Sequence, residues 1–197
     1  WNEGRLTREI IKDYAEQYYQ HVKAFPRYIS ATHSICDDIE KRKILLENLQ
    51  DEENQDGDHP KLWKNFAKAM GADEKKIENV KPDSFTKEMI NNFFTQARSS
   101  YAEGLASLYT YERQIPEIAE TKIQGLKKFY GVNSKEGLEF FEAHKSADIV
   151  HRAECEKLLD GLSKEEQEKA EKASLLTAKF LWNFLSGMTS KHKLQLV

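Results

Sequence analysis

The stretch from His144 to His151 reads His-Lys-Ser-Ala-Asp-Ile-Val-His, and its spacing decides how the chain is expected to fold. An α-helix turns by about 100° per residue, so His144, Asp148 and His151 would lie within about 60° of one another on one face. Two imidazoles and a carboxylate on one face are suited to iron, manganese or zinc. The stretch therefore predicts a metal-binding helix. The alternative is a solvated face, because charged residues surround the motif: Glu142, Lys145, Arg152 and Glu154.

Two further places in the chain carry groups that could join this helix. Glu52 and His59 fall where one apolar helix is expected to end and the next to begin. Glu112 follows the charge-poor stretch 108–111, and a carboxylate buried there is costly unless a cation or a metal is its partner. The alternative for Glu112 is a salt bridge to a basic residue such as Arg113.

Together, these positions supply three carboxylates and three imidazoles. That is enough for two metal ions with one bridging carboxylate and with positions left open for oxygen. The pattern differs from the doubled Glu-x-x-His motif of ferritin-like sites. Zinc could occupy such ligands, but an oxygen-rich set with open positions favours redox-active iron, as an iron pair or an iron and manganese pair. The predicted ligands are Glu52, His59, Glu112, His144, Asp148 and His151.

The composition indicates one all-α domain over residues 1–197. Charged residues make up 32% of the chain, and Gly (9) and Pro (4) are scarce, which is typical of long helices with charged surfaces. A net charge of -3 gives no field that would attract nucleic acid or an anionic membrane. No apolar run approaches the roughly 20 residues that span a bilayer, and no signal peptide opens the chain. Cys36 and Cys155 form no CxxC pair and are expected to be buried inert thiols, as in a cytoplasmic protein.

Helical periodicity and capping residues predict seven helical segments. They cover residues 7–25, 27–53, 58–70, 84–114, 116–130, 134–159 and 163–186. A bend is expected near Ser99 and Ser100. The buried side of the second segment is expected at Ile35, Ile39, Leu45, Leu46 and Leu49. His21 is expected to be a hydrogen-bonded structural histidine.

Longer blocks of the sequence resemble a known family, the haem-oxygenase-like diiron oxidases, over nearly the whole chain. The resemblance includes all six predicted ligand positions. The blocks that carry it are Asp13-Tyr14-Ala15, Tyr18-Tyr19, residues 23–28, residues 51–54, Leu62-Trp63, residues 109–116 and Lys122-Ile123-x-Gly125-Leu126.

This resemblance implies a bundle of seven or more helices around a dimetal centre that uses O2 and an external reductant. In the branch that this chain resembles most, one of the protein's own tyrosines is oxidised to p-aminobenzoate for folate synthesis. Lys122 matches the expected amino-group donor, although the residues alone favour a lysine on the helix surface. Tyr111 matches a tyrosine near the metals and is a candidate for radical relay, with a core tyrosine as the alternative.

The chain also departs from the pattern of this family. Phe140 stands where a tyrosine is expected, and the sacrificial tyrosine would fall a couple of residues before Trp1. One alternative is an oxidase of a small external substrate, as in pyrroloquinoline quinone synthases. A second is an interaction protein that binds host death domains, exported into a host cell. The residues leave open whether the chain forms a homodimer.

Overall fold

The computed structural model describes residues 1–55 and 57–194, and the side chains of residues 146–150 lie outside this description. All regular elements of the described part are helices, as expected for an all-α chain. They are α1 (Arg8–Val22), α2 (Phe25–Ser34), α3 (Ile39–Glu52), α4 (His59–Ala69), α5 (Glu74–Ile77), α6 (Ser84–Ser99), α7 (Tyr101–Glu112), α8 (Ile115–Tyr130), α9 (Lys135–Asp160) and α10 (Lys164–Lys191).

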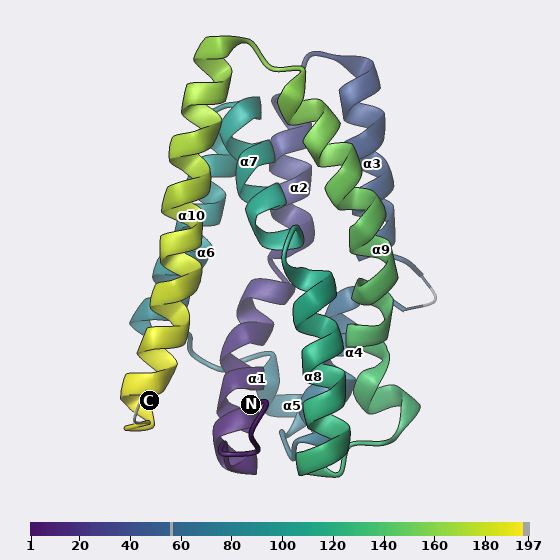
Figure 1. Cartoon of the computed structure of the whole chain (residues 1–197), viewed down its shortest axis with the longest axis vertical. Helices are drawn as coiled ribbons and strands as arrows, with labels where there is room; N and C mark the ends of the chain where they lie inside the picture. The colour runs from purple at the N-terminus through teal and green to yellow at the C-terminus, as the bar shows by residue number, and fades with distance from the viewer. Residues whose placement is uncertain (56, 195–197) are drawn as a thin grey trace.

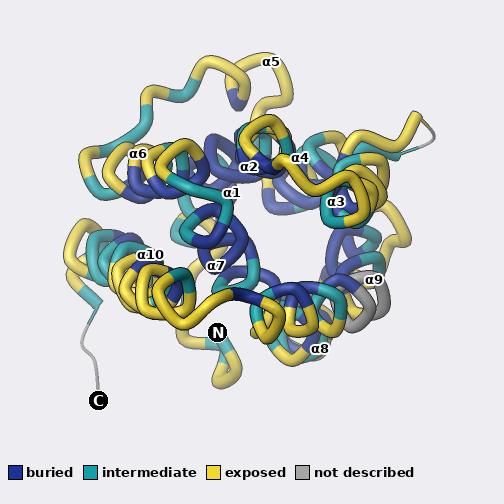
Figure 2. Tube along the Cα trace, turned by 90° about the horizontal axis from the view of Figure 1, so that it is seen from above, coloured by how far each residue is buried: buried dark blue, intermediate teal, exposed yellow. Residues whose placement is uncertain are grey.

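The helices form an elongated bundle (Figure 1). The two long helices α9 and α10 run along opposite sides, and α7 and α8 follow one another lengthwise between them. Helix α9 packs against α4 and α8, whereas α10 packs against α6 and α7. Seen from above, the buried positions of the helices face the inside of the bundle and the exposed positions face outward (Figure 2).

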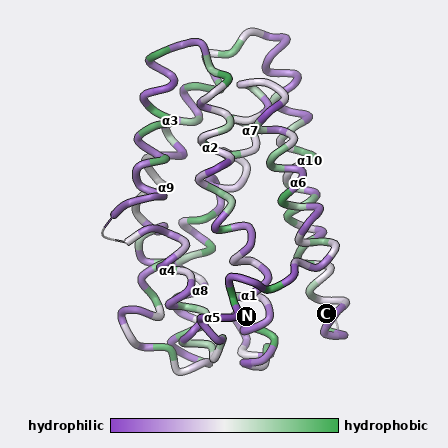
Figure 3. Tube along the Cα trace, turned by 180° about the vertical axis from the view of Figure 1, so that it is seen from behind, coloured by the Kyte–Doolittle hydropathy of each residue, from purple (hydrophilic) through white to green (hydrophobic). Residues whose placement is uncertain are grey.

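Hydrophobic and hydrophilic segments alternate along the helices (Figure 3). This is the pattern of helices that bury one face and expose the other. Among the residues that the structure describes, no helix has the length and the apolar character needed to cross a membrane.

Local signals in the sequence set most helix ends. Ser163 and Glu166 form a reciprocal capping box at the start of α10, as their spacing predicts. Thr7 accepts a hydrogen bond from the Ile10 backbone N–H at the start of α1. Helix α8 ends at Gly131, whose φ of 68° is in the left-handed region that glycine adopts without strain.

The prediction of one continuous helix over residues 27–53 is wrong. Helix α2 ends at Ser34, and α3 begins only after Asp38, whose side chain accepts hydrogen bonds from the backbone N–H groups of residues 40 and 41. The break leaves several residues that were expected to be buried at the surface of the protein. After the break, burial was expected for Ile39, Leu45, Leu46 and Leu49, and of these Leu45 is the one that is fully buried. The exposed residues are Ile35, Ile39 and Leu46.

The predicted segment 84–114 is likewise two helices. Ser100 has extended backbone angles (φ -156°, ψ 164°), and its side chain caps α7 by accepting from the Glu103 N–H. The expected bend near Ser99 and Ser100 is therefore a full interruption between α6 and α7. The short helix α5 lies in a connector for which the sequence predicted no helix.

The core is rich in aromatic rings, and His21 lies within it. His21 is fully buried, and its ring lies 4.8 Å from that of Phe93 and 5.0 Å from that of Tyr111, between ring centroids. The described part of the protein offers no hydrogen-bond partner to either ring nitrogen, so the expectation of a hydrogen-bonded histidine is wrong. Burial lowers the pKa of His21 from 6.5 to about 3, which keeps the ring neutral at ordinary pH.

Replacing His21 with Leu should make the free energy of unfolding less dependent on pH. Between the folded pKa of about 3 and the unfolded value of 6.5, the unfolded chain binds the proton and the folded chain does not, so stability falls as pH decreases. For one group this amounts to about 2 kcal/mol between pH 7 and pH 5. Urea unfolding at both pH values should give a difference smaller by that amount in His21→Leu. The partly exposed His33→Leu is the control, and a full pH dependence in His21→Leu would contradict the assignment.

Candidate metal centre

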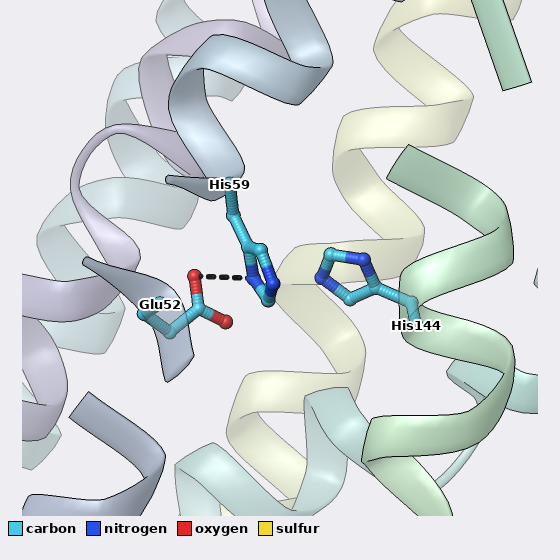
Figure 4. A group of neighbouring side chains, drawn as sticks. All are labelled: Glu52, His59 and His144. Atoms are coloured by element: carbon cyan, nitrogen blue, oxygen red, sulfur yellow. Dashed lines mark ion pairs between the residues drawn. The ribbon is translucent and has the colours of Figure 1, made fainter. Parts of the chain in front are cut away.

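Three buried side chains from three helices meet in the middle of the bundle (Figure 4). They are Glu52 at the end of α3, His59 at the start of α4 and His144 in α9. One ligand atom from each lies within 4.8 Å of the other two. The Nδ1 atom of His59 is 2.9 Å from Oε2 of Glu52, and the rings of His59 and His144 are 4.2 Å apart between centroids.

The local sequence fixes the first two of these groups. Glu52 is the last residue of α3, and a short polar loop leads to Asp58, which caps α4 by accepting from the Lys61 N–H at 2.8 Å. Pro60 is in the first turn of α4, where its missing N–H leaves no helix hydrogen bond unmade. The cap and the proline together place His59 at a fixed position in the first turn, where it faces Glu52.

The electrostatics of the cluster match a site for a cation. Burial alone would raise the pKa of Glu52, but His59, followed by His144 and His151, outweighs this effect and holds the pKa below its usual value. Glu52 is therefore an ionised carboxylate that is only 5% exposed. An ionised group in such a place needs a cationic partner, and a carboxylate with two imidazoles is a donor set that iron and manganese accept. The residues present are thus suited to a metal ion.

His144 is oriented by the backbone of its own helix. Its Nδ1 atom is 2.7 Å from the carbonyl oxygen of Phe140, one turn earlier in α9. A histidine that donates one ring N–H to a backbone carbonyl carries an acceptor lone pair on its other nitrogen, and metal-bound histidines use this arrangement. The hydrogen bond leaves Nε2 of His144 to face the other two groups.

The remaining predicted ligands lie nearby in sequence or in the bundle interior, and their role as ligands stays a prediction. Glu112 is the last residue of α7 and is 2% exposed; its Oε1 accepts a hydrogen bond from Asn48 at 2.7 Å. His151 is 5% exposed, and its Nε2 is 3.0 Å from a carboxylate oxygen of Asp51. The side chain of Asp148 lies outside the described residues. The helix predicted for the His144–His151 motif is present within α9.

The sequence analysis did not identify the residues that contact the predicted ligands Glu112 and His151. Asn48 is one turn before Glu52 on α3, and Asp51 is its immediate neighbour in the chain. Cys155, expected to be a buried inert thiol, is indeed buried, and its Sγ lies 3.8 Å from Oε2 of Glu112. Their spacing in the sequence could have identified two of them. Asn48 and Cys155 each lie four residues from a predicted ligand, and residues four apart on a helix are neighbours on the same face.

Lys122 lies inside a cage of aromatic rings. Its Nζ donates a hydrogen bond to the hydroxyl of Tyr14 at 2.6 Å, and five ring centroids lie between 4.7 and 5.9 Å away. Burial lowers the pKa of Lys122 from 10.5 to about 7. The residue is half-buried, so its amine lies among rings and not on the open helix surface that the residues alone favoured. The rings belong to Trp1, Tyr14, Tyr18, Trp63 and Phe141.

Two aromatic rings lie between the Lys122 amine and the carboxylate-histidine cluster. The ring of Phe140 is 4.0 Å from that of His144, and the ring of Trp63 is 4.7 Å from that of Phe140. Nζ of Lys122 is 5.9 Å from the Trp63 ring. Phe140, which replaces the expected tyrosine, is thus part of the wall between the cluster and the amine.

Tyr111 connects the end of α7 with the lysine cage. It is 4% exposed and precedes Glu112 in α7. Tyr111 is hydrogen-bonded to Tyr18, whose pKa burial raises to about 12 despite this bond. The Tyr18 ring in turn stacks on Tyr14 at 5.3 Å. A line of phenols therefore connects the neighbour of Glu112 with the partner of Lys122.

Replacing His144 with Ala should abolish stoichiometric metal loading without unfolding the protein. Loss of one imidazole opens the coordination shell, while alanine maintains α9 because it has the highest helix propensity. Iron bound after anaerobic loading should be measured by elemental analysis, and helix content by circular dichroism. His33→Ala, at a partly exposed position on α2, should load like the wild type. Full loading of His144→Ala would refute the ligand assignment.

Asn48→Ala should weaken metal binding without removing a ligand. The Asn48 amide holds Oε1 of Glu112, and loss of such an orienting partner typically lowers metal affinity by about 10- to 100-fold. Competition with a chelator measures the affinity. The exposed Asn91→Ala on α6 serves as the matched control. An unchanged affinity in Asn48→Ala would mean that Glu112 binds no metal.

Comparisons with known proteins agree with this geometry. Residues 12–182 match the family described as iron-containing redox enzymes. The chain is 42% identical to a protein of Chlamydia trachomatis named 4-aminobenzoate synthase, with 95% of this chain and 81% of the relative covered. A protein of the same name from Nitrosomonas europaea is 37% identical over 100% of this chain and 85% of its own length. A solved Shewanella denitrificans domain with a heme oxygenase-like fold covers 98% of this chain and 83% of its own, at a TM-score of 0.84 and 15% identity.

Proposed function

Because the chain belongs to the family of iron-containing redox enzymes, we propose that it is a dimetal oxygenase that makes 4-aminobenzoate from one of its own tyrosines. O2 and an external reductant are the co-substrates in this proposal. The main support for this proposal is the position of the Lys122 amine in its aromatic cage. The rings of Trp63 and Phe140 connect this cage with the cluster of Glu52, His59 and His144.

In this proposal two metal ions, as an iron pair or an iron and manganese pair, are held by the six predicted ligands. Iron at this position supplies the one-electron and oxygen chemistry that amino-acid side chains lack. Glu52 and Glu112 contribute buried carboxylates, and His59 and His144 contribute imidazoles whose rings are 4.2 Å apart. The mixed oxygen and nitrogen donor set supports iron and manganese over a soft thiolate-bound metal.

Lys122 is the proposed source of the amino group. Removal of its proton is a prerequisite for a lysine nitrogen to form a bond to carbon, because an ammonium group has no lone pair. Burial among rings lowers its pKa to about 7, so a large share of the amines is neutral at neutral pH. The Tyr14 hydroxyl, 2.6 Å away, holds Nζ in place and can exchange a proton with it.

Tyr111 is the proposed relay for oxidising equivalents. It is adjacent to the predicted ligand Glu112 in the chain and hydrogen-bonded to Tyr18, so it connects the end of α7 with a phenol of the lysine cage. Tyr111 and Tyr18 are no more than 9% exposed, which limits the contact of an oxidised side chain with water.

Isotope labelling tests the origin of the product. The native full-length protein, prepared with ring-labelled carbon-13 tyrosine and loaded with iron, should release labelled 4-aminobenzoate after exposure to O2 and reductant, as measured by mass spectrometry. Lys122→Met should lose at least about 90% of the product while binding the same amount of iron, because it removes the amine and retains the apolar stem. Lys127→Met, exposed on the same helix, should leave the yield unchanged.

Unlabelled product, formed only when a small aromatic compound is added, would instead establish an oxidase of an external substrate. Bound iron without any 4-aminobenzoate would reject the proposed reaction and leave the metal centre in place.

A further inference from the structure

A cavity of about 710 Å³ opens between α1, α8 and α10, away from the carboxylate-histidine cluster. Its volume is within the range of pockets that hold small organic ligands. Glu52, His59, Glu112, His144 and His151, the predicted ligands whose side chains the structure describes, do not line it. Most of its walls are aliphatic or aromatic, and they include Ile11, Tyr14, Tyr18, Ile118, Leu181 and Phe184.

Lys122 supplies a reactive group to this cavity. It lines the cavity wall, and its Nζ is hydrogen-bonded to the Tyr14 hydroxyl. Among the described residues no carboxylate forms an ion pair with Nζ; the nearby Glu117 is instead 3.3 Å from Arg152. Without a countercharge, the buried amine loses its proton easily, and its pKa is about 7.

The aromatic cage limits what kind of ligand the cavity can take. Aromatic cages commonly bind cations, but here the lysine amine already occupies that position. A second cation therefore has no place in the cage, whereas a neutral ligand with an electrophilic carbon could react with the neutral form of the amine. Flat aromatic groups pack well against the Tyr14 and Tyr18 rings, which stack at 5.3 Å.

We propose that this cavity binds a planar aromatic molecule carrying an aldehyde carbon, and that Nζ of Lys122 attacks that carbon to form an imine. A nitrogen–carbon bond forms and the carbon–oxygen double bond breaks. The carbonyl oxygen leaves as water with the two hydrogens of the neutral amine, and no electrons are gained or lost. The Tyr14 hydroxyl is placed to pass the proton from nitrogen to oxygen. This site extends beyond the proposed synthesis of 4-aminobenzoate.

Reductive trapping tests this reaction directly. The full chain, kept free of metal and O2, is mixed with 4-hydroxybenzaldehyde and sodium cyanoborohydride, and labelled lysines are located by peptide mass spectrometry. At pH 7 Lys122 should be labelled at least about tenfold faster than Lys127, because a lysine of ordinary pKa is almost fully protonated there. The preference should shrink as the pH rises toward about 10, where Lys127 also loses its proton.

Saturation and competition separate a binding site from a merely reactive amine. Labelling of Lys122 should saturate with aldehyde concentration and should be slowed by 4-hydroxybenzyl alcohol, which has the ring but no carbonyl. Equal labelling of Lys122 and Lys127, or a rate that rises linearly and ignores the competitor, would overturn the proposal.

A cavity-filling variant provides the second test without touching the lysine. Ala178 lines the cavity from an exposed position on α10, so Ala178→Phe should narrow the cavity and leave the core packing intact. Labelling of Lys122 should fall several-fold, and that of Lys127 should not change. Undiminished labelling would overturn the cavity assignment. Since no metal is present, failure here and failure of 4-aminobenzoate synthesis are separate results.

Discussion

A buried, ionised carboxylate beside a pair of imidazoles is the constraint on which this structure depends. Glu52, His59 and His144 are each no more than 5% exposed, and removing a carboxylate from water costs several kcal/mol unless a cation repays it. Meeting this requirement brings three separate segments to one point: the end of α3, the start of α4 and the middle of α9. The bundle thereby becomes a frame that holds these groups in a fixed geometry.

The aromatic rings around the amine explain the unusual state of Lys122. Trp63 and Phe140 separate the carboxylate-histidine cluster from the lysine cage, and Tyr14 offers the amine a neutral partner. Among the described residues no carboxylate forms an ion pair with this amine, so its ammonium form is poorly stabilised and the neutral amine becomes accessible near pH 7. A packed aromatic core can therefore place an oxidising centre and a nucleophilic amine close together without contact between them.

Much of the fold could be predicted from local signals. The capping box at Ser163 and the periodicity of α9 indicated long helices, and the motif from His144 to His151 lies on one of them as its spacing predicts. The break between α2 and α3 could not be predicted in this way, because no proline or glycine marks it. Its only signal is Asp38, and acidic residues are common on the exposed faces of continuous helices.

The candidate site also has one part that could be predicted from the sequence and one part that could not. Residue type and spacing pointed to Glu52, His59 and His144, since buried carboxylates and imidazoles have few structural uses without a cation. The cage of Lys122 was beyond such reasoning, because its rings come from the N-terminal segment, α1, α4 and α9. Only the packing of distant segments turns an ordinary lysine on α8 into a buried amine. The resemblance to the diiron oxidases, not the residues themselves, singled it out.

Anomalous diffraction from crystals loaded anaerobically with iron and manganese tests the central claim most directly. Data on both sides of each metal's absorption edge identify the element at each peak. The account predicts two peaks in the bundle interior, each in direct contact with ligand atoms of Glu52, His59 and His144 or of the other predicted ligands. A single peak, or peaks that avoid these three side chains, would contradict it.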